Sequence, residues 1–134
     1  SSAASDVYKR QGNDQPNYQV SDIATTMEML EKAGIKTSIM VDCSHANSCK
    51  DHTRQEIVLA DVLNQVSEGN GSIGSVMIES FLKEGNQKMA DKLEDLTYGV
   101  SITDKCVNWE TTERMLRHAH AELKKCGGRK LSGS

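Results

Sequence analysis

Three short apolar runs in the middle of the chain each end in a side chain that can bind a metal ion. They are IMVDCSH over residues 39–45, IGSVMIE over residues 73–79 and VSITD over residues 100–104. Their last residues are His45, Glu79 and Asp104. Near-continuous apolar runs of this length are typical of strands buried on both faces, as in a parallel sheet. The pattern therefore predicts parallel strands with a polar side chain at each carboxyl end.

The spacing between these strand ends suits βαβ units. Successive ends are separated by roughly 25 to 35 residues, and a strand, a crossover helix and a second strand need about 30. Strands connected in this way end on one rim of a sheet or barrel, where α/β enzymes hold their active sites. We therefore expect His45, Glu79 and Asp104 to converge.

Periodicity and capping residues extend the pattern into an alternating α/β chain. The predicted elements are a helix over 22–33, a strand over 37–43, a helix over 52–66, strands over 72–79 and 97–103, and a helix over 109–125. Ser21 and Asn108 are the predicted N-caps, and Gly34 and Gly127 the predicted helix ends. Three strands are fewer than a closed or doubly wound sheet needs. We therefore interpret the chain as part of a larger α/β protein.

The two ends of the chain differ from the segment between them. Residues 1–11 (SSAASDVYKRQ) are small and polar without periodicity, and we interpret them as a non-native leader outside the fold. Residues 127–134 begin with two glycines and are expected to form a flexible tail. The predicted domain is therefore residues 12–126.

Composition argues against a nucleic-acid-binding, a membrane-spanning and a secreted protein. The 134 residues carry a formal net charge of −3, which gives no basic patch for nucleic acid or anionic membrane. No apolar run approaches the about 20 residues of a membrane span, and the start is not that of a signal peptide. The four cysteines form no CxxC pair, so we interpret them as free thiols. We expect a cytoplasmic protein with no nucleic-acid or membrane partner.

One imidazole and two carboxylates suit borderline or hard divalent ions. Mn²⁺, Fe²⁺, Co²⁺ or Zn²⁺ accept such ligands and keep positions open for substrate or water. Each residue also has an ordinary alternative, because a strand-end histidine is often a hydrogen-bonded structural residue and a strand-end carboxylate is often a helix cap. On spacing alone, the metal site and these structural roles both remain open.

The strings around the three residues closely resemble the type I 3-deoxy-D-arabino-heptulosonate 7-phosphate (DAHP) synthases. They are DCSHANS over 42–48, MIES over 77–80, EGNQ over 84–87 and YGVSITDKC over 98–106. The resemblance covers about residues 12–123. It implies an α/β fold that is the C-terminal part of a (β/α)8 TIM barrel, about three βα units, incomplete in this chain.

The resemblance also implies an activity and roles for the three residues. In that family the matching residues ligate a divalent metal, so His45, Glu79 and Asp104 are the implied ligands. His45 is also the implied catalytic residue, and His45 and Asp104 are implied to contact substrate. The implied reaction condenses phosphoenolpyruvate with D-erythrose 4-phosphate and water to give DAHP and phosphate, the first step of the shikimate pathway. The full-length parent is expected to be a homo-oligomer.

This chain departs from the family pattern in two respects. The family's fourth metal ligand, a cysteine, and most of its phosphate-binding basic residues come from upstream segments that are not present here. The family also has Arg-Gly-Gly ahead of Pro-Asn-Tyr, where this chain has Arg10-Gln11-Gly12. Arg10 is therefore a candidate phosphate-binding residue that falls inside the predicted leader. We expect the isolated chain to be inactive.

Two further interpretations stay open. The chain could be a non-catalytic truncation that pairs its open strand edge with another chain. It could also belong to another metal-dependent barrel aldolase or lyase, which would share the His/Glu/Asp rim but not the EGNQ loop. The sequence upstream of residue 12 would distinguish the truncation from the enzyme.

Overall fold

Helices and strands alternate along the chain, as predicted for an α/β protein. The computed structural model describes residues 7–9 and 15–129. Its elements are β1 (Val7–Lys9), α1 (Val20–Lys32), β2 (Ile39–Asp42), α2 (Gln55–Ser67), β3 (Ile73–Met77) and α3 (Trp109–Lys125). Short 3₁₀ turns lie between them: η1 (His45–Ser48), η2 (His52–Arg54) and η3 (Leu93–Asp95). The α/β class is therefore confirmed.

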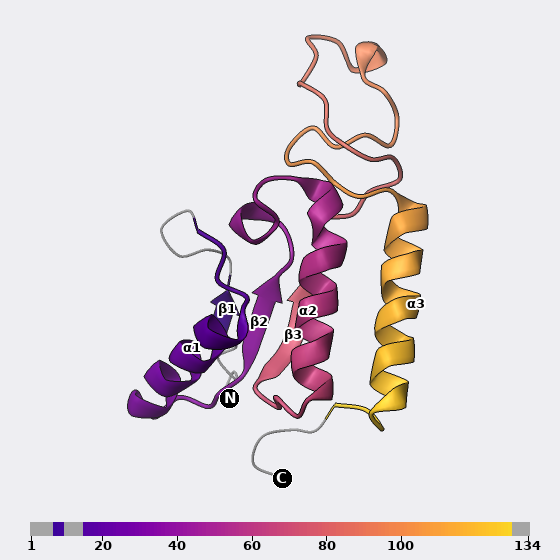
Figure 1. The fold of residues 1–134 in the computed structure, drawn as a ribbon. Coiled ribbons are helices and arrows are strands. Elements are labelled where there is room, and N and C mark those ends of the chain that lie inside the picture. Colours follow the sequence, from indigo (N-terminus) through magenta and orange to yellow (C-terminus); the bar gives the residue numbers. More distant parts are fainter. Residues whose placement is uncertain (1–6, 10–14, 130–134) are drawn as a thin grey trace, which may run out of the picture.

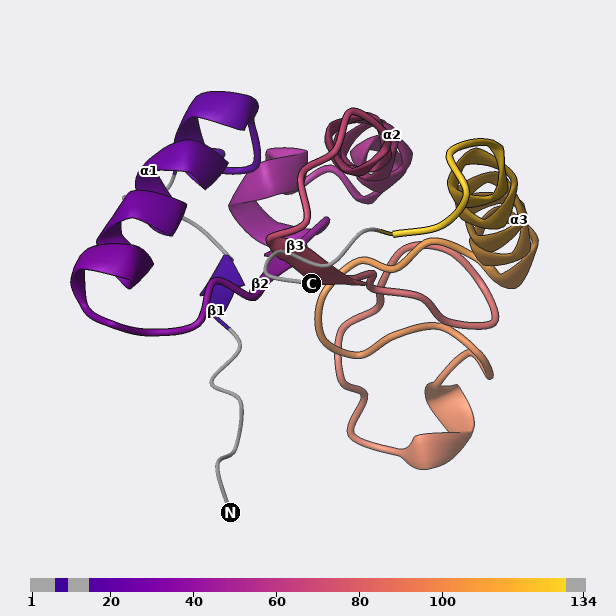
Figure 2. The same ribbon diagram turned by 90° about the horizontal axis from the view of Figure 1, so that it is seen from below.

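The strands form one parallel sheet in the order β1-β2-β3. Ile39 of β2 lies opposite Val7 on one side and Ile73 on the other. The three helices lie on one side of this sheet (Figure 2). Ile39 and Val41 of β2 are fully buried in the same core as Val58 of α2. Because the strands are parallel, their carboxyl ends share one edge of the sheet.

The helices begin close to the predicted positions, but not always with the predicted cap. Asn108 caps α3, since its side chain accepts the backbone N–H of Thr111 at 2.8 Å. Ser21 lies inside α1 and is not its cap; instead the backbone N–H of Gln19 donates to the carboxylate of Asp22 at 3.2 Å.

Within residues 7–9 and 15–129, no helix is both long and apolar enough to cross a membrane.

The predicted strand over residues 97–103 is wrong. This segment forms turns, with one isolated parallel bridge between Ser101 and Asn86. The backbone N–H of Gln87 donates to the carbonyl of Ser101 at 2.7 Å. The segment is therefore paired with the EGNQ loop, and its backbone does not continue the sheet beyond β3.

The N-terminal stretch also differs from the prediction. Residues 7–9 form β1, which pairs with β2, so the expectation that residues 1–11 contribute nothing to the fold is wrong there. The non-native origin of the stretch stays a prediction. Arg10 lies outside the described residues, as do residues 130–134 of the predicted tail.

The long connection between β3 and α3 extends beyond the carboxyl ends of β2 and β3 (Figure 1). Its two ends are tied together, because Val107 donates its N–H to the carbonyl of Glu79 and accepts the N–H of Phe81, both at 3.0 Å. Further out, Gly85 and Cys106 exchange backbone hydrogen bonds of 2.8 and 3.1 Å. Backbone hydrogen bonds therefore close the connection into a loop, which lies at the edge of the sheet where β2 and β3 end.

Candidate metal centre

His45, Glu79 and Asp104 meet at the carboxyl ends of β2 and β3. His45 opens η1, Glu79 follows β3, and Asp104 lies in the connection to α3. The Nε2 atom of His45 is 3.3 Å from Oε1 of Glu79 and 3.1 Å from Oδ2 of Asp104. One potential ligand atom from each residue lies within 4.8 Å of the others. The structure thus brings together the residues selected from the sequence, and their roles as ligands remain predictions.

A buried carboxylate orients the imidazole of His45. The Oδ2 atom of Asp42, at the end of β2, is 2.7 Å from Nδ1 of His45, and the Asp42 side chain is fully buried. Its Oδ1 atom accepts the backbone N–H of Ser44 at 2.8 Å. With Nδ1 directed at Asp42, Nε2 faces the two other acids. Metal-binding histidines commonly have this arrangement, in which a carboxylate holds the nitrogen that is not the ligand.

Glu79 is held through both its backbone and its side chain. The amide of Gln55, a fully buried residue of α2, accepts the Glu79 N–H at 2.8 Å and donates to the Glu79 carbonyl at 3.1 Å. The hydroxyl of Ser44 donates to Oε2 of Glu79 at 3.0 Å, which leaves Oε1 toward His45.

Burial raises the pKa of Glu79, and the nearby charge of Asp104 adds to this effect. The hydrogen bond from Ser44 and the charge of His45 act in the opposite direction. A carboxylate that has lost part of its hydration is stabilised by a cation beside it. The electrostatics of Glu79 therefore favour a positively charged ligand.

Asp104 occupies the open side of the cluster. Its side chain is 62% exposed, against 16% for His45 and 17% for Glu79. The EGNQ loop supports the segment that carries it, since the side chain of Asn86 donates to the carbonyl of Thr103 at 2.8 Å. Asp104 is therefore the most accessible of the three side chains in this chain.

The geometry of the cluster fits one divalent ion. Ligand bonds of about 2.0–2.2 Å at angles of about 90–110° place neighbouring ligand atoms about 3.0–3.5 Å apart. The separations from His45 Nε2, 3.1 and 3.3 Å, fall in this range. An Nε2 lone pair that faces two carboxylates needs either a proton or a metal ion between these acceptors. The donor set is that of Mn²⁺, Fe²⁺, Co²⁺ or Zn²⁺ sites.

Sequence reasoning missed three residues that support the site. Asp42 and Ser44 belong to the DCSHANS string, so their position beside His45 could have drawn attention to them. Gln55 contacts Glu79 across 24 residues of chain, and no local pattern marks it.

The cysteines are free thiols, as predicted. Cys43, two residues before His45, is fully buried. Burial, aided by the charge of Asp42, raises the pKa of Cys43 to about 12. Cys43 therefore stays protonated at neutral pH.

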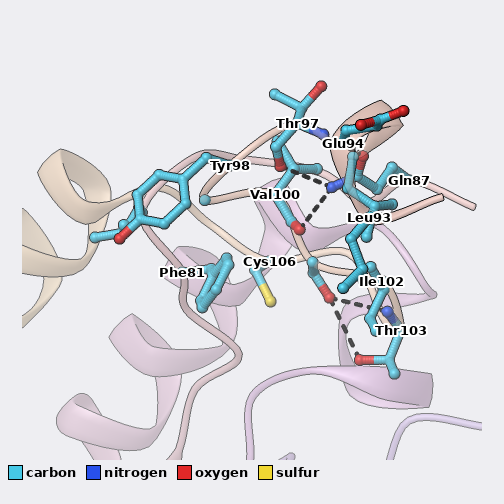
Figure 3. Close-up of a pocket in the computed structure, with 14 residues that line it drawn as sticks. Phe81, Gln87, Leu93, Glu94, Thr97, Tyr98, Val100, Ile102, Thr103 and Cys106 are labelled. Atoms are coloured by element: carbon cyan, nitrogen blue, oxygen red, sulfur yellow. Dashed lines mark hydrogen bonds between the residues drawn. The ribbon is translucent and has the colours of Figure 1, made fainter. Parts of the chain in front are cut away.

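A groove of about 900 Å³ lies in the connection between β3 and α3 (Figure 3). Thr103 and Cys106, on either side of Asp104 in the chain, contribute to its wall. Most of the remaining wall is apolar, formed by Phe81, Leu82, Leu93, Tyr98 and Ile102. Glu94 is the only charged residue that lines it among the described residues. The groove therefore offers no cation to a phosphate group.

Comparisons with known proteins identify similar sequences. A Tyr-sensitive phospho-2-dehydro-3-deoxyheptonate aldolase of Escherichia coli strain K12 is 46% identical over 112 residues, which cover 84% of this chain and 32% of the relative. The Phe-sensitive aldolase of the same strain is 46% identical over 106 residues, covering 79% and 30%. The chain thus spans about a third of the length of these relatives.

A solved structure and a family model give the same assignment. The phospho-2-dehydro-3-deoxyheptonate aldolase of Francisella tularensis SCHU S4 superposes with a TM-score of 0.81 at 44% identity, over 88% of this chain and 34% of that one. The sequence model of the DAHP synthetase I family matches residues 4–117, which include part of the predicted leader. The chain therefore belongs to the DAHP synthetase I family.

Proposed function

We propose that this chain supplies the His45, Glu79 and Asp104 ligands of the metal centre in a DAHP synthase. That enzyme would condense phosphoenolpyruvate with D-erythrose 4-phosphate and water to give DAHP and phosphate. The observation that carries the proposal is the convergence of the three side chains within 4.8 Å in a chain of this family. Homologues named as aldolases of the same heptonate phosphate support the reaction class.

The chain's own residues would prepare the site for an aldehyde substrate. Asp42 holds the Nδ1 side of His45, and Gln55 and Ser44 hold Glu79, so two ligand atoms are positioned before anything binds. Preorganised ligands reduce the cost of assembling the reactive geometry. A divalent ion held there would act as a Lewis acid toward the aldehyde oxygen of the tetrose phosphate.

The reaction then needs substrate orientation and removal of phosphate. C3 of phosphoenolpyruvate would attack the aldehyde carbon, water would add at C2, and phosphate would leave. Asp104 lies on the exposed side, where it can contact the tetrose phosphate, and His45 is placed to contact phosphoenolpyruvate. Because the groove beside Asp104 lacks cations among its lining residues, the phosphate groups require basic residues from elsewhere. Arg10 remains a candidate for one of these contacts.

We further propose that the parallel sheet and its helices are about three βα units at the C-terminal end of a (β/α)8 barrel. The order β1-β2-β3 with helices on one side supports this proposal. The high TM-score against a much longer chain supports it as well. We propose a cytoplasmic homo-oligomer for the complete enzyme.

A chimera in which this chain replaces the matching part of a longer relative tests the proposal. The segment of the E. coli Tyr-sensitive aldolase that aligns with this chain is replaced by the corresponding residues of this chain, and condensation is assayed with added Mn²⁺. We expect turnover that a chelator abolishes and Mn²⁺ restores. A folded chimera without turnover, beside an active parent enzyme, would contradict the proposal and favour the non-catalytic alternative.

A further inference from the structure

We propose that Asp42 is a positioning residue for the candidate metal centre. It holds His45 with a proton on Nδ1, so that the Nε2 lone pair is directed at the position between Glu79 and Asp104. The inference rests on the proposed function only in naming the ion that Nε2 receives. Its own evidence is the hydrogen bonding around Asp42.

Both carboxylate oxygens of Asp42 face hydrogen-bond donors. Oδ1 is 2.8 Å from the backbone nitrogen of Ser44, which can only donate. Oδ2 is 2.7 Å from Nδ1 of His45, a separation typical of charge-assisted hydrogen bonds. Because the Asp42 side chain is fully buried, water cannot replace His45 as the donor to Oδ2. The carboxylate therefore requires a proton on Nδ1 of His45.

The loop that carries His45 has supports that do not depend on this carboxylate. The side chain of Asn47 donates to the backbone carbonyl of Asp42 at 2.8 Å. The hydroxyl of Ser48 donates to the carbonyl of His45 at 3.0 Å, and the N–H of Lys50 donates to the same carbonyl at 2.9 Å. These bonds hold His45 at a φ of 50°, in the left-handed region that is uncommon for non-glycine residues. A change confined to the Asp42 carboxylate should therefore leave the loop in place.

Asp42→Asn distinguishes positioning from simple structural support. The asparagine oxygen can still accept the N–H of Ser44, which places the amide NH₂ against Nδ1 of His45. Two donors cannot face each other at this distance, so the imidazole proton should move to Nε2. A protonated Nε2 has no lone pair for a metal ion. The variant should thus keep the fold and lose the ligand.

The experiment uses ¹⁵N NMR of the histidine side chains in the full 134-residue chain, without metal and with Zn²⁺. The chain has four histidines, and His45→Gln assigns the relevant ring. In the wild type we expect a hydrogen-bonded proton on Nδ1 of His45. In Asp42→Asn that proton should be absent from Nδ1, and Zn²⁺ affinity should fall by about 10-fold to 100-fold. Asp91→Asn, at an exposed position of the same residue type, should change neither.

Each outcome either supports or overturns the inference. Retention of the Nδ1 proton in Asp42→Asn, or a loss of Zn²⁺ affinity below about threefold, would overturn it. If the asparagine variant does not fold, the wild-type spectrum decides, because an unprotonated Nδ1 in His45 contradicts the proposal. Should the chain alone give an unfolded spectrum, the same variants are measured in the chimera.

The inference and the proposed function can fail separately. A chimera that binds Zn²⁺ through His45 without turnover would contradict the proposed function and leave the role of Asp42 intact. A chimera that catalyses the condensation with an unprotonated Nδ1 in His45 would contradict the role of Asp42 and leave the proposed function intact. If the folded chimera binds no Zn²⁺, the proposed function fails and the Nδ1 proton alone decides the role of Asp42.

Discussion

Gln55 links helix α2 to the candidate metal centre, and its removal should cost both stability and metal affinity. In Gln55→Ala, the backbone N–H of Glu79 loses its 2.8 Å acceptor and the Glu79 carbonyl loses a 3.1 Å donor. The carbonyl keeps the N–H of Val107 at 3.0 Å. The Glu79 N–H has no such second partner among the backbone hydrogen bonds of the described residues.

The magnitude follows from these two bonds. A buried hydrogen bond contributes about 0.5–1.5 kcal/mol, and an unsatisfied buried N–H costs about 1–3 kcal/mol. Because the carbonyl stays satisfied, we expect the free energy of unfolding to fall by about 2–4 kcal/mol. With an m-value of about 2 kcal/mol/M, the urea midpoint should fall by roughly 1–2 M.

Urea unfolding of the purified chain, followed by circular dichroism, measures this effect. Asn64→Ala is the matched control, because Asn64 is an exposed amide on the same helix; its change should stay within about 0.5 kcal/mol. A Gln55→Ala variant as stable as this control would refute the assigned role of Gln55. Zn²⁺ titration of the same variants adds a second measurement, since displacement of Glu79 should weaken binding.

Three other predictions concern the ligands, the isolated chain and the buried thiol. In the chimera, Glu79→Ala or Asp104→Ala should lower turnover by about two orders of magnitude or more. The control His118→Ala, on the exposed face of α3, should leave turnover nearly unchanged. Near-normal rates of the carboxylate variants at limiting Mn²⁺ would contradict the ligand assignment. The isolated 134-residue chain should not catalyse the condensation, because the three-stranded sheet of the described residues cannot close a barrel. In addition, none of the described residues that line the groove between β3 and α3 is cationic. Robust turnover with both substrates and excess Mn²⁺ would show the opposite. Folding raises the pKa of Cys43 from 9.0 to about 12, so the folded state holds this proton more tightly and its contribution to stability is complete below pH 9. That contribution should be lost at about 1.4 kcal/mol per pH unit between pH 9 and pH 12. In Cys43→Ala, the free energy of unfolding measured in urea should therefore fall less steeply with pH over this range. Equal slopes in the variant and the wild type would rule out this contribution of Cys43.

Local sequence determined the α/β class, the approximate helix positions and the three residues of the candidate site. The apolar runs before His45 and Glu79 identified β2 and β3 because burial on both faces requires such runs. Asn108 identified the start of α3 because its side chain can bond a free backbone N–H. Parallel strands end on one edge, so the convergence of His45 and Glu79 followed from strand order. Asp104 joins them from the connection to α3, and only the structure shows how that connection is held.

Tertiary contacts decided the remaining features. Residues 97–103 have a strand-like sequence, but a strand needs a paired neighbour, and the EGNQ loop bonds this backbone instead of β3. Residues 7–9 (VYK) are too short a run to show a strand pattern, yet they pair with β2. Gln55 and Asp42 support the site through hydrogen bonds whose meaning depends on burial and direction. Burial and bond direction exist only once the chain has folded. The sequence could therefore select the candidate ligands but not the residues that orient them.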